Sequence, residues 1–287
     1  MEHDPRRAAG YIVASAFMFA LTGATVKAAS ARLPHTEVVF FRSFLGLIAL
    51  TPWLIRSGIS GLRTRRPGLH LLRGFAGLAA MYCFFYALGH LELATAVLLN
   101  YSAPLFIPFI AALWLGEPVP RALRWAIPLG FVGIALILKP GMGMLEPAAL
   151  LGLAAGILAA VAFVAVRRLH SSEPTTRIVF YFGVISTVGS AVPLAWTWQT
   201  PEYALWTLLG AMGLCATGGQ LLLTRAYAFA PAAQVGPFTY SVVVFSALLG
   251  WAVWGEVPGS LAILGAVLVI LAGALAIRRR SPAKRSR

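Results

Sequence analysis

The amino-acid sequence predicts an all-α integral membrane protein with ten transmembrane helices, arranged as two inverted five-helix repeats. Three observations predict this fold class: an apolar composition, ten apolar runs of spanning length, and an internal duplication. Of the 287 residues, 59% are hydrophobic and only 11% are charged, and the mean hydropathy is +0.82. Soluble domains carry about 25% charged residues, so lipid must surround most of this chain in place of water.

Ten apolar runs come close to the ~20 residues that a helix needs to cross the hydrocarbon core of a bilayer. The connections between them are short, and the longest internal one, from Arg56 to Leu69, is rich in arginine. We expect the ten spans at residues 10–30, 36–55, 69–90, 93–115, 122–139, 148–168, 176–198, 203–229, 232–254 and 259–277.

The basic residues predict the orientation of these spans. If the N-terminus lies in the cytoplasm, 19 of the 23 lysines and arginines fall on the cytoplasmic side and three fall outside, while Arg42 lies within a span. Cytoplasmic loops of membrane proteins carry such an excess of positive charge. We therefore expect both termini in the cytoplasm. Because topology accounts for the net charge of +14, we expect no nucleic-acid partner.

The chain also repeats itself. Residues 87–120 and 226–259 align without a gap at an offset of 139, which superposes two Tyr-Ser pairs and two Gly-Glu pairs. These pairs are Tyr101-Ser102 with Tyr240-Ser241, and Gly116-Glu117 with Gly255-Glu256. Five spans per copy is an odd number, so the second copy must be inverted in the membrane relative to the first. We expect a first repeat over 8–140, a second over 146–278 and a basic cytoplasmic tail over 279–287.

The sequence lacks the residue patterns that several classes of membrane protein need. None of the nine acidic residues and none of the five histidines lies at the centre of a span, and no cluster has metal-ligand spacing. Motifs of nucleotide-binding loops, membrane proteases and transferases are also missing. This argues against an enzyme, an ATP-driven pump and coupling through a buried carboxylate. Cys83 and Cys215 lie in apolar runs and are interpreted as packing residues. We expect no cofactor and no metal.

Neutral polar residues do reach the centre of two spans. Asn100, Tyr101 and Ser102 lie in the fourth span and Thr239, Tyr240 and Ser241 in the ninth, and a proline accompanies each group. A proline inside a helix frees the carbonyl four residues back, and Pro104 therefore frees that of Asn100. Because the two spans are repeat mates, we expect the two groups to face each other across a cavity. The alternative is that they simply hold helices together.

Further candidates lie in other spans. Tyr82 lies in the third span among aromatic residues, and Gln220 follows a pair of glycines in the eighth. Arg42 is interpreted as one member of a structural ion pair, with Glu37 or the outer end of the first span near Lys27 as its partner, and with a substrate contact as the alternative. Glu117 and Glu256 are interpreted as structural turn residues near the start of the next helix, where a carboxylate can cap free N–H groups, with a role as a gate as the alternative.

The run from Ala87 to Lys139, with its P-L-F centre, L-G-E exit and following G-F-V-G-I-A-L-I-L helix, resembles an EamA domain of the drug/metabolite transporter superfamily. Residues 226–277 resemble a second copy, in which Val243-Val244-Phe245 replaces P-L-F. The nearest branch is the bacterial amino-acid exporters of YddG type. The resemblance implies a central cavity surrounded by spans 1, 3, 4, 6, 8 and 9. The candidate substrate-binding residues are Thr22, Tyr82, Asn100, Tyr101, Ser102, Gln220, Thr239, Tyr240 and Ser241.

The expected function is that of a multi-pass secondary transporter in the bacterial inner membrane. We expect it to export small metabolites by alternating access, with neutral or aromatic and apolar amino acids as the first substrate class. Its expected partners are the small-molecule substrate and membrane lipids, and its expected state is a monomer or homodimer. The alternatives are transport of nucleosides, S-adenosylmethionine or cationic compounds, and a membrane scaffold that transports nothing.

Overall fold

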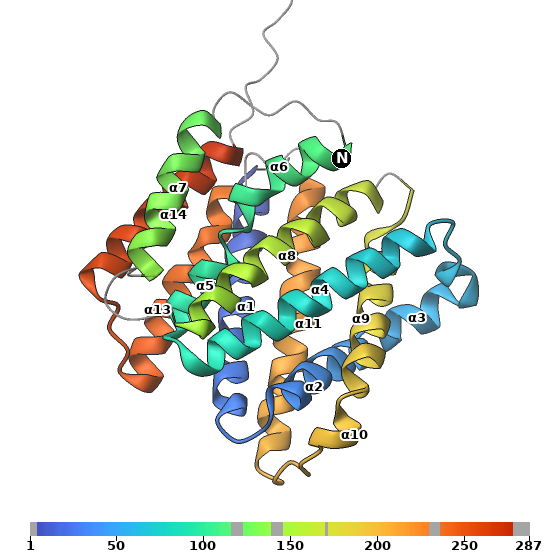
Figure 1. The fold of residues 1–287 in the computed structure, drawn as a ribbon. Helices are drawn as coiled ribbons and strands as arrows, with labels where there is room; N and C mark the ends of the chain where they lie inside the picture. Colours follow the sequence, from blue (N-terminus) through green and yellow to red (C-terminus); the bar gives the residue numbers. More distant parts are fainter. Residues whose placement is uncertain (1–4, 116–122, 139–145, 170–171, 230–235, 278–287) are drawn as a thin grey trace, which may run out of the picture.

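The computed structural model describes residues 5–115, 123–138, 146–169, 172–229 and 236–277. Within these ranges the protein is a bundle of helices without a β-strand (Figure 1), which confirms the all-helical class. The first half contains α1 (Pro5–Ser30), α2 (His35–Ile48), α3 (Thr51–Ser57), η1 (Ile59–Leu62), α4 (Pro67–His90), α5 (Leu93–Asn100), α6 (Ala103–Leu115) and α7 (Leu123–Leu138). The second half contains α8 (Pro147–Leu169), α9 (Thr175–Ala191), α10 (Leu194–Thr197), α11 (Leu205–Phe229), η2 (Gly236–Tyr240), α13 (Ser241–Trp254) and α14 (Ser260–Ile277).

Five described segments are long and apolar enough to cross a bilayer: Arg6–Ser30, Pro67–His90, Leu93–Trp114, Pro147–Val166 and Leu205–Leu223. Four shorter apolar helices cover Ile127–Leu136, Thr176–Ala191, Phe238–Trp254 and Ser260–Ala272. These segments fall on nine of the ten runs that the sequence marks as spans. Large apolar side chains cover the outside of the bundle, since Leu113 is 89% and Trp125 is 77% exposed. Such a surface suits lipid and not water.

Prolines divide two of the expected spans. The run over 36–55 is not one helix: α2 ends at Ile48 and α3 begins at Thr51, with Pro52 in its first turn. In the run over 93–115, α5 ends at Asn100 and Pro104 stands in the first turn of α6. The ring of a proline clashes with the carbonyl four residues earlier. Those carbonyls belong to the last residues of α2 and α5, which explains where both helices stop.

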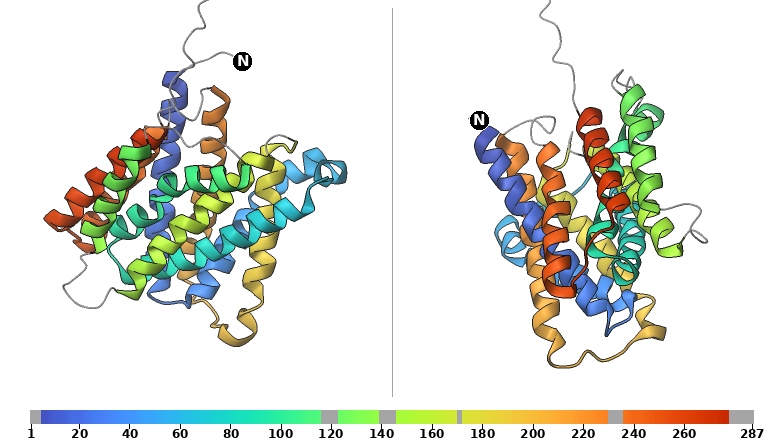
Figure 2. Two further views of the ribbon diagram at one scale, coloured as in Figure 1. Left: turned by 45° about the horizontal axis from the view of Figure 1, so that its top comes forward. Right: turned by 90° about the vertical axis from the view of Figure 1, so that its left-hand side faces the viewer.

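The strongest packing joins helices from different halves of the chain. α1 packs along α11, α4 along α8, and α7 along α14, while α2 contacts α9 and α5 contacts α13. Figure 1 and the left view of Figure 2 both show α7 beside α14 and α4 beside α8. Each of these pairs takes one helix from before residue 139 and one from after residue 145. The two halves therefore pack against each other through several pairs of helices.

The helix boundaries follow the offset of 139 residues seen in the sequence. Shifted by this offset, α4 would cover 206–229 and α6 would cover 242–254, which match α11 and α13 within one residue at each end. α1 and α7 correspond in the same way to α8 and α14, to within three residues. The start of α1 and the end of α14 lie at the same end of the molecule (Figure 2).

Candidate functional site

The turn between α5 and α6 carries three of the candidate residues. Asn100 ends α5, and Tyr101 and Ser102 form the turn. Ser102 is completely buried, and its Oγ donates a hydrogen bond of 2.6 Å to the carbonyl of Leu99. α8 approaches the turn at Gly156, where a Cβ would lie 2.8 Å from the Leu99 oxygen. This helix break is therefore a tightly packed feature of the interior.

The corresponding turn in the second half lies in η2, just before α13. Tyr240 is 3% exposed, and its hydroxyl has no hydrogen-bond partner among the described residues. The Oγ of Ser241 donates 2.6 Å to the carbonyl of Phe238, and Thr239 lies between them in η2. The beginning of this expected span, residues 232–235, lies outside the described residues.

Thr22 and Tyr82 come from two further helices, α1 and α4. The Thr22 hydroxyl donates 2.9 Å to the carbonyl of Met18 within its own helix. The Tyr82 hydroxyl is buried and, in the described part of the chain, unpaired. α1 packs against α4, α5, α13 and η2, and both Tyr82 and Tyr101 pack against the same hydrophobic core. Eight of the nine candidates therefore lie on α1 or on elements that contact α1 or directly follow such an element: α4, the end of α5 and the turn after it, η2 and the start of α13.

Gln220 lies on α11, which packs along α1. It lines a small cavity of about 30 Å³ between the middles of α2, α9 and α11, next to Arg42, Ser43 and Thr217. A neighbouring, mainly apolar cavity of about 350 Å³ lies between α2, α3 and α9. The two share Leu47 and Leu50. The larger one is open to the outside of the bundle, since Phe44 and Ile48 in its lining are 39% and 49% exposed.

The expected ion pair of Arg42 with Glu37 is wrong. Glu37 is fully buried and accepts a hydrogen bond from the backbone N–H of Gln199. Arg42 lies instead over the ring of Phe182, with its Cζ 5.8 Å from the ring centre, and Arg73 lies over the same ring at 4.0 Å. Sequence reasoning missed Arg73 and Phe182. The available signal was that Arg73 falls inside the expected span 69–90, where a charged residue marks a functional site.

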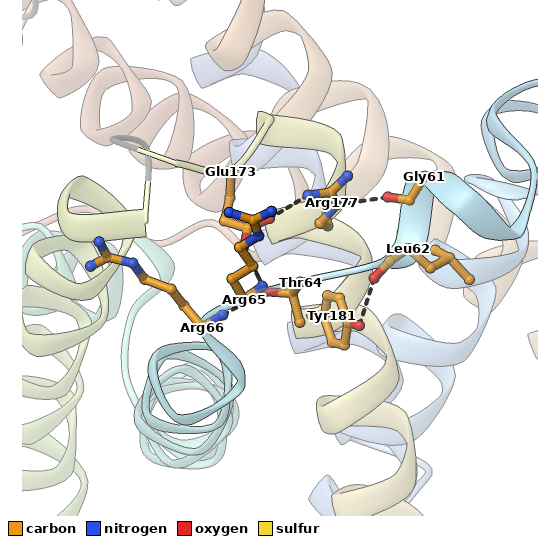
Figure 3. Close-up of polar contacts among 8 residues, drawn as sticks. All are labelled: Gly61, Leu62, Thr64, Arg65, Arg66, Glu173, Arg177 and Tyr181. Carbon is orange, nitrogen blue, oxygen red and sulfur yellow. Dashed lines mark hydrogen bonds and ion pairs between the residues drawn. The ribbon is translucent and has the colours of Figure 1, made fainter.

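One polar network ties the segment 61–66, before α4, to the start of α9 (Figure 3). The Glu173 carboxylate accepts hydrogen bonds of 2.6 Å from the Thr64 hydroxyl and 2.6 Å from the Arg177 guanidinium, and one of 3.4 Å from the Arg65 N–H. Burial raises the pKa of this carboxyl, but the hydrogen bonds outweigh burial, and the net pKa lies below its ordinary value. Glu173 is therefore an ionised carboxylate held between the two halves.

Two backbone carbonyls complete this network. Arg177 also donates 2.7 Å through Nε to the carbonyl of Gly61, and the Tyr181 hydroxyl donates 2.7 Å to that of Leu62. In these two bonds the donors lie on α9 and the acceptors are backbone carbonyls of the first half, as Figure 3 shows. The loop between α3 and α4 is thus fixed by the second half of the chain.

A second network joins the halves at the end of α1. The Lys27 ammonium donates 2.5 Å to the carbonyl of Leu91 and lies 2.5 Å from Oε1 of Glu256. The other oxygen of Glu256 accepts the N–H of Leu93 at 2.8 Å. The expectation that Glu256 caps the helix following it is therefore wrong, since it caps α5 of the first half, where helix dipole and free N–H groups favour a carboxylate. Its repeat mate Glu117 lies outside the described residues.

The family model of the EamA-like transporter family matches the chain twice, over residues 6–139 and 146–278. The chain is 38% identical over 263 residues to the pseudopaline exporter CntI of Pseudomonas aeruginosa, covering 91% of this chain and 92% of the relative. It is 31% identical over 278 residues to a riboflavin transporter of Vibrio cholerae, covering 94% and 93%. It is 31% identical over 243 residues to an S-adenosylmethionine uptake transporter of Rickettsia bellii, covering 83% and 82%.

A solved structure, described only as the crystal structure of a protein, matches with a TM-score of 0.66 at 20% identity. The match covers 96% of this chain and 97% of that one, and it shows the shared fold. The resemblance to EamA domains is confirmed, and the chain is a multi-pass membrane protein whose relatives transport small molecules. The chain belongs to the EamA-like transporter family of the drug/metabolite transporter superfamily.

Proposed function

We propose that this protein is a secondary transporter that exports small metabolites from a bacterial cell by alternating access. Two inverted five-helix repeats, 8–140 and 146–278, enclose the substrate site in the inner membrane. Both termini and the basic tail, 279–287, lie in the cytoplasm, and the protein acts as a monomer or homodimer.

The observation that carries this proposal is the pairing of helices between the halves. The repeat mates are α1 with α8, α2 with α9, α4 with α11, and α7 with α14. If every helix is replaced by its mate, the pair α1–α11 becomes α8–α4, while α2–α9 and α7–α14 are unchanged. A set of contacts that maps onto itself is expected from a two-fold axis between the halves. Repeats related in this way bind substrate at their interface.

The two polar networks support the proposal that the interface between the halves opens and closes during transport. The network around Glu173 and the network around Lys27 and Glu256 each join residues of both halves. By the expected topology the first lies on the cytoplasmic side and the second on the outer side. Alternating access requires that such contacts break on one side at a time.

The candidate residues support small, partly apolar metabolites as substrates. Tyr82 and Tyr240 offer buried hydroxyls without described partners, and Gln220 offers a side-chain amide at the wall of a cavity beside an apolar pocket. These groups suit amino acids or compounds built from them. Other metabolites are alternative substrates, because relatives at 31% identity are named for riboflavin and S-adenosylmethionine.

The experiment is a flux measurement with the purified full chain in sealed vesicles. A panel of labelled amino acids, riboflavin, S-adenosylmethionine and nucleosides is loaded, and exit is compared with that from empty-membrane vesicles. We expect specific exit of at least one class. Tyr101→Ala and Gln220→Ala should each lower it about tenfold, the equivalent of one lost hydrogen bond of about 1.4 kcal/mol.

The matched control is Tyr203→Ala, because Tyr203 is 94% exposed between α10 and α11. This variant should transport like the parent. If no solute leaves faster than from empty vesicles, the transporter proposal fails. If flux occurs but Tyr101→Ala and Gln220→Ala transport normally, the substrate does not touch the candidate residues.

A further inference from the structure

Two arginines meet in the middle of the bundle. Arg42 lies halfway along α2, and Arg73 reaches in from the second turn of α4. Both guanidinium groups face the ring of Phe182, which lies at the middle of α9, with Cζ-to-centre distances of 5.8 and 4.0 Å. Both side chains are partly buried, and the Nε of Arg73 is fully buried.

No carboxylate in the described part of the chain neutralises these charges. The described carboxylates are engaged elsewhere: Glu37 with the N–H of Gln199, Glu92 with Thr95, Glu173 with Arg177, Glu202 with Arg32, and Glu256 with Lys27. Glu146 is exposed at the start of α8. Among the residues that the structure describes, the pair therefore has no acidic partner.

This arrangement is unfavourable without a ligand. The two positive charges repel each other, and the Nε of Arg73 is buried without an acceptor in the described structure. The face of Phe182 attracts a cation through its quadrupole but carries no net negative charge. Gly77 leaves room for the Arg73 guanidinium, which a Cβ at that position would hit. Buried arginines are ordinarily paired with acids, so an anion from outside the chain is the missing partner.

The cavities beside the pair indicate the shape of that anion. Arg42 lines the small cavity together with the Gln220 amide and the hydroxyls of Ser43 and Thr217. The adjoining 350 Å³ cavity is mainly apolar and shares Leu47 with it. The small cavity holds about one water molecule at 30 Å³, so α2, α9 and α11 must separate to admit a solute. A ligand would then place its charged end at the arginines and its apolar part in the larger cavity.

We propose, resting on the transport function above, that Arg42 and Arg73 form a carboxylate-binding centre and that the substrate is an organic anion with two carboxylates. A guanidinium binds a carboxylate through two parallel hydrogen bonds, and two carboxylates balance two arginines. A neutral zwitterion would leave both positive charges uncompensated, because its ammonium group cancels its single carboxylate. This narrows the amino-acid class to its acidic members and to related dicarboxylic acids.

The first arm of the test measures thermal stability of the purified full chain at constant ionic strength. The probes are glutamate, succinate, phenylsuccinate, methionine and inorganic phosphate. A ligand that binds the folded state raises its stability. We expect the dicarboxylates, phenylsuccinate most of all, to raise the melting temperature by about 2–5 °C, and methionine and phosphate to leave it unchanged. Stabilisation by phosphate or methionine, without any by the dicarboxylates, would overturn the proposal.

The second arm uses variants in the flux assay. Arg42→Gln and Arg73→Gln should each lower dicarboxylate flux and the ligand-induced shift at least tenfold, and Arg42→Lys should retain part of both because it keeps the charge. Arg56→Gln removes the same charge from an exposed position at the end of α3 and should behave like the parent.

The melting temperature measured without ligand distinguishes a structural role of the two arginines from a role in ligand binding. Relief of the repulsion predicts that Arg73→Gln melts no lower than the parent. If the ligand-free variants melt several degrees lower and retain their preference for dicarboxylates, the arginines are structural. If neutral amino acids are transported equally by the parent and by Arg42→Gln, the carboxylate centre is wrong while the transporter stands. If no solute moves at all, the transport function itself fails.

Discussion

Glu173 is a carboxylate whose ionised form is built into the contact between the halves. It is 5% exposed and accepts hydrogen bonds from Thr64, Arg65 and Arg177. Charge-assisted hydrogen bonds are worth about 1.5–3 kcal/mol each, more than neutral ones. Because these bonds favour the ionised form, the pKa in the folded protein lies below that in the unfolded chain. The resulting stabilisation is fully present above the ordinary pKa of 4.5 and is lost as the pH falls through the folded value.

Glu173→Gln should therefore lower the stability of the protein near neutral pH and make that stability depend less on pH. We expect a loss of about 1–3 kcal/mol in the free energy of unfolding at pH 7, and a smaller difference from the parent at pH 3. Melting temperatures of the two proteins in the same detergent, measured from pH 3 to pH 7, test this. An equal difference at every pH would mean that the ionisation of Glu173 does not support the fold.

The residue scale also shows why sequence reasoning paired Arg42 incorrectly. Glu37 is its nearest acid in the chain, five residues earlier. Side chains share a face of a helix at spacings of three or four, so a spacing of five turns Glu37 away from Arg42 and toward Gln199. Gln220 lines a cavity, but its role as a substrate-binding residue stays a prediction. The closeness of Arg73 and Phe182 to Arg42 depends on tertiary packing between three helices, which no local pattern shows.

At the scale of the element, the helix breaks were largely predictable and their packing was not. Pro104 indicated a break beside Asn100, and Pro52 explains the end of α2 at Ile48. The apolar run over 36–55 concealed that second break, since its hydropathy continues across the division. The contact of α8 with the α5–α6 turn depends on Gly156.

Gly156→Ala should destabilise the protein more than the same change at an open position. An added Cβ would lie 2.6 Å from the Ser102 Oγ and 2.8 Å from the Leu99 oxygen, and the latter is backbone that cannot rotate away. Overpacking of this kind costs about 1–3 kcal/mol. Gly210→Ala is the control, because nothing lies within 4 Å of its added Cβ and alanine favours a helix. Comparable melting temperatures for the two variants would show that α8 does not press on the turn.

At the scale of the whole molecule, the duplication, the distribution of charge and the helix pairing all indicate one architecture. The sequence contained the 139-residue offset, and the helix boundaries follow it from α1 to α14. Which helices pair could not be predicted, because these contacts join residues far apart in the chain, more than fifty positions apart in every pair. The pairing of α1 with α11 and of α4 with α8 is the new information.

The orientation of this architecture can be tested with single cysteines in intact cells. In a Cys83→Ser/Cys215→Ser background, Tyr203→Cys should react with a membrane-impermeant maleimide added outside. Arg63→Cys should react only after the membrane is opened. Both positions are exposed, and the excess of basic residues places the second on the cytoplasmic side. Labelling of Arg63→Cys in intact cells would contradict the expected topology.

The most direct test of alternating motion between the halves is to measure flux after the halves have been cross-linked. The hydroxyls of Thr36 and Thr197 lie 2.8 Å apart, between α2 of the first half and α10 of the second, a separation that suits a disulfide. In the cysteine-free background, Thr36→Cys/Thr197→Cys should transport like the parent under reducing conditions, lose flux on oxidation, and regain it when reductant is added. Undiminished flux through a fully cross-linked protein would show that the halves do not separate there, and the account of alternating access would be contradicted.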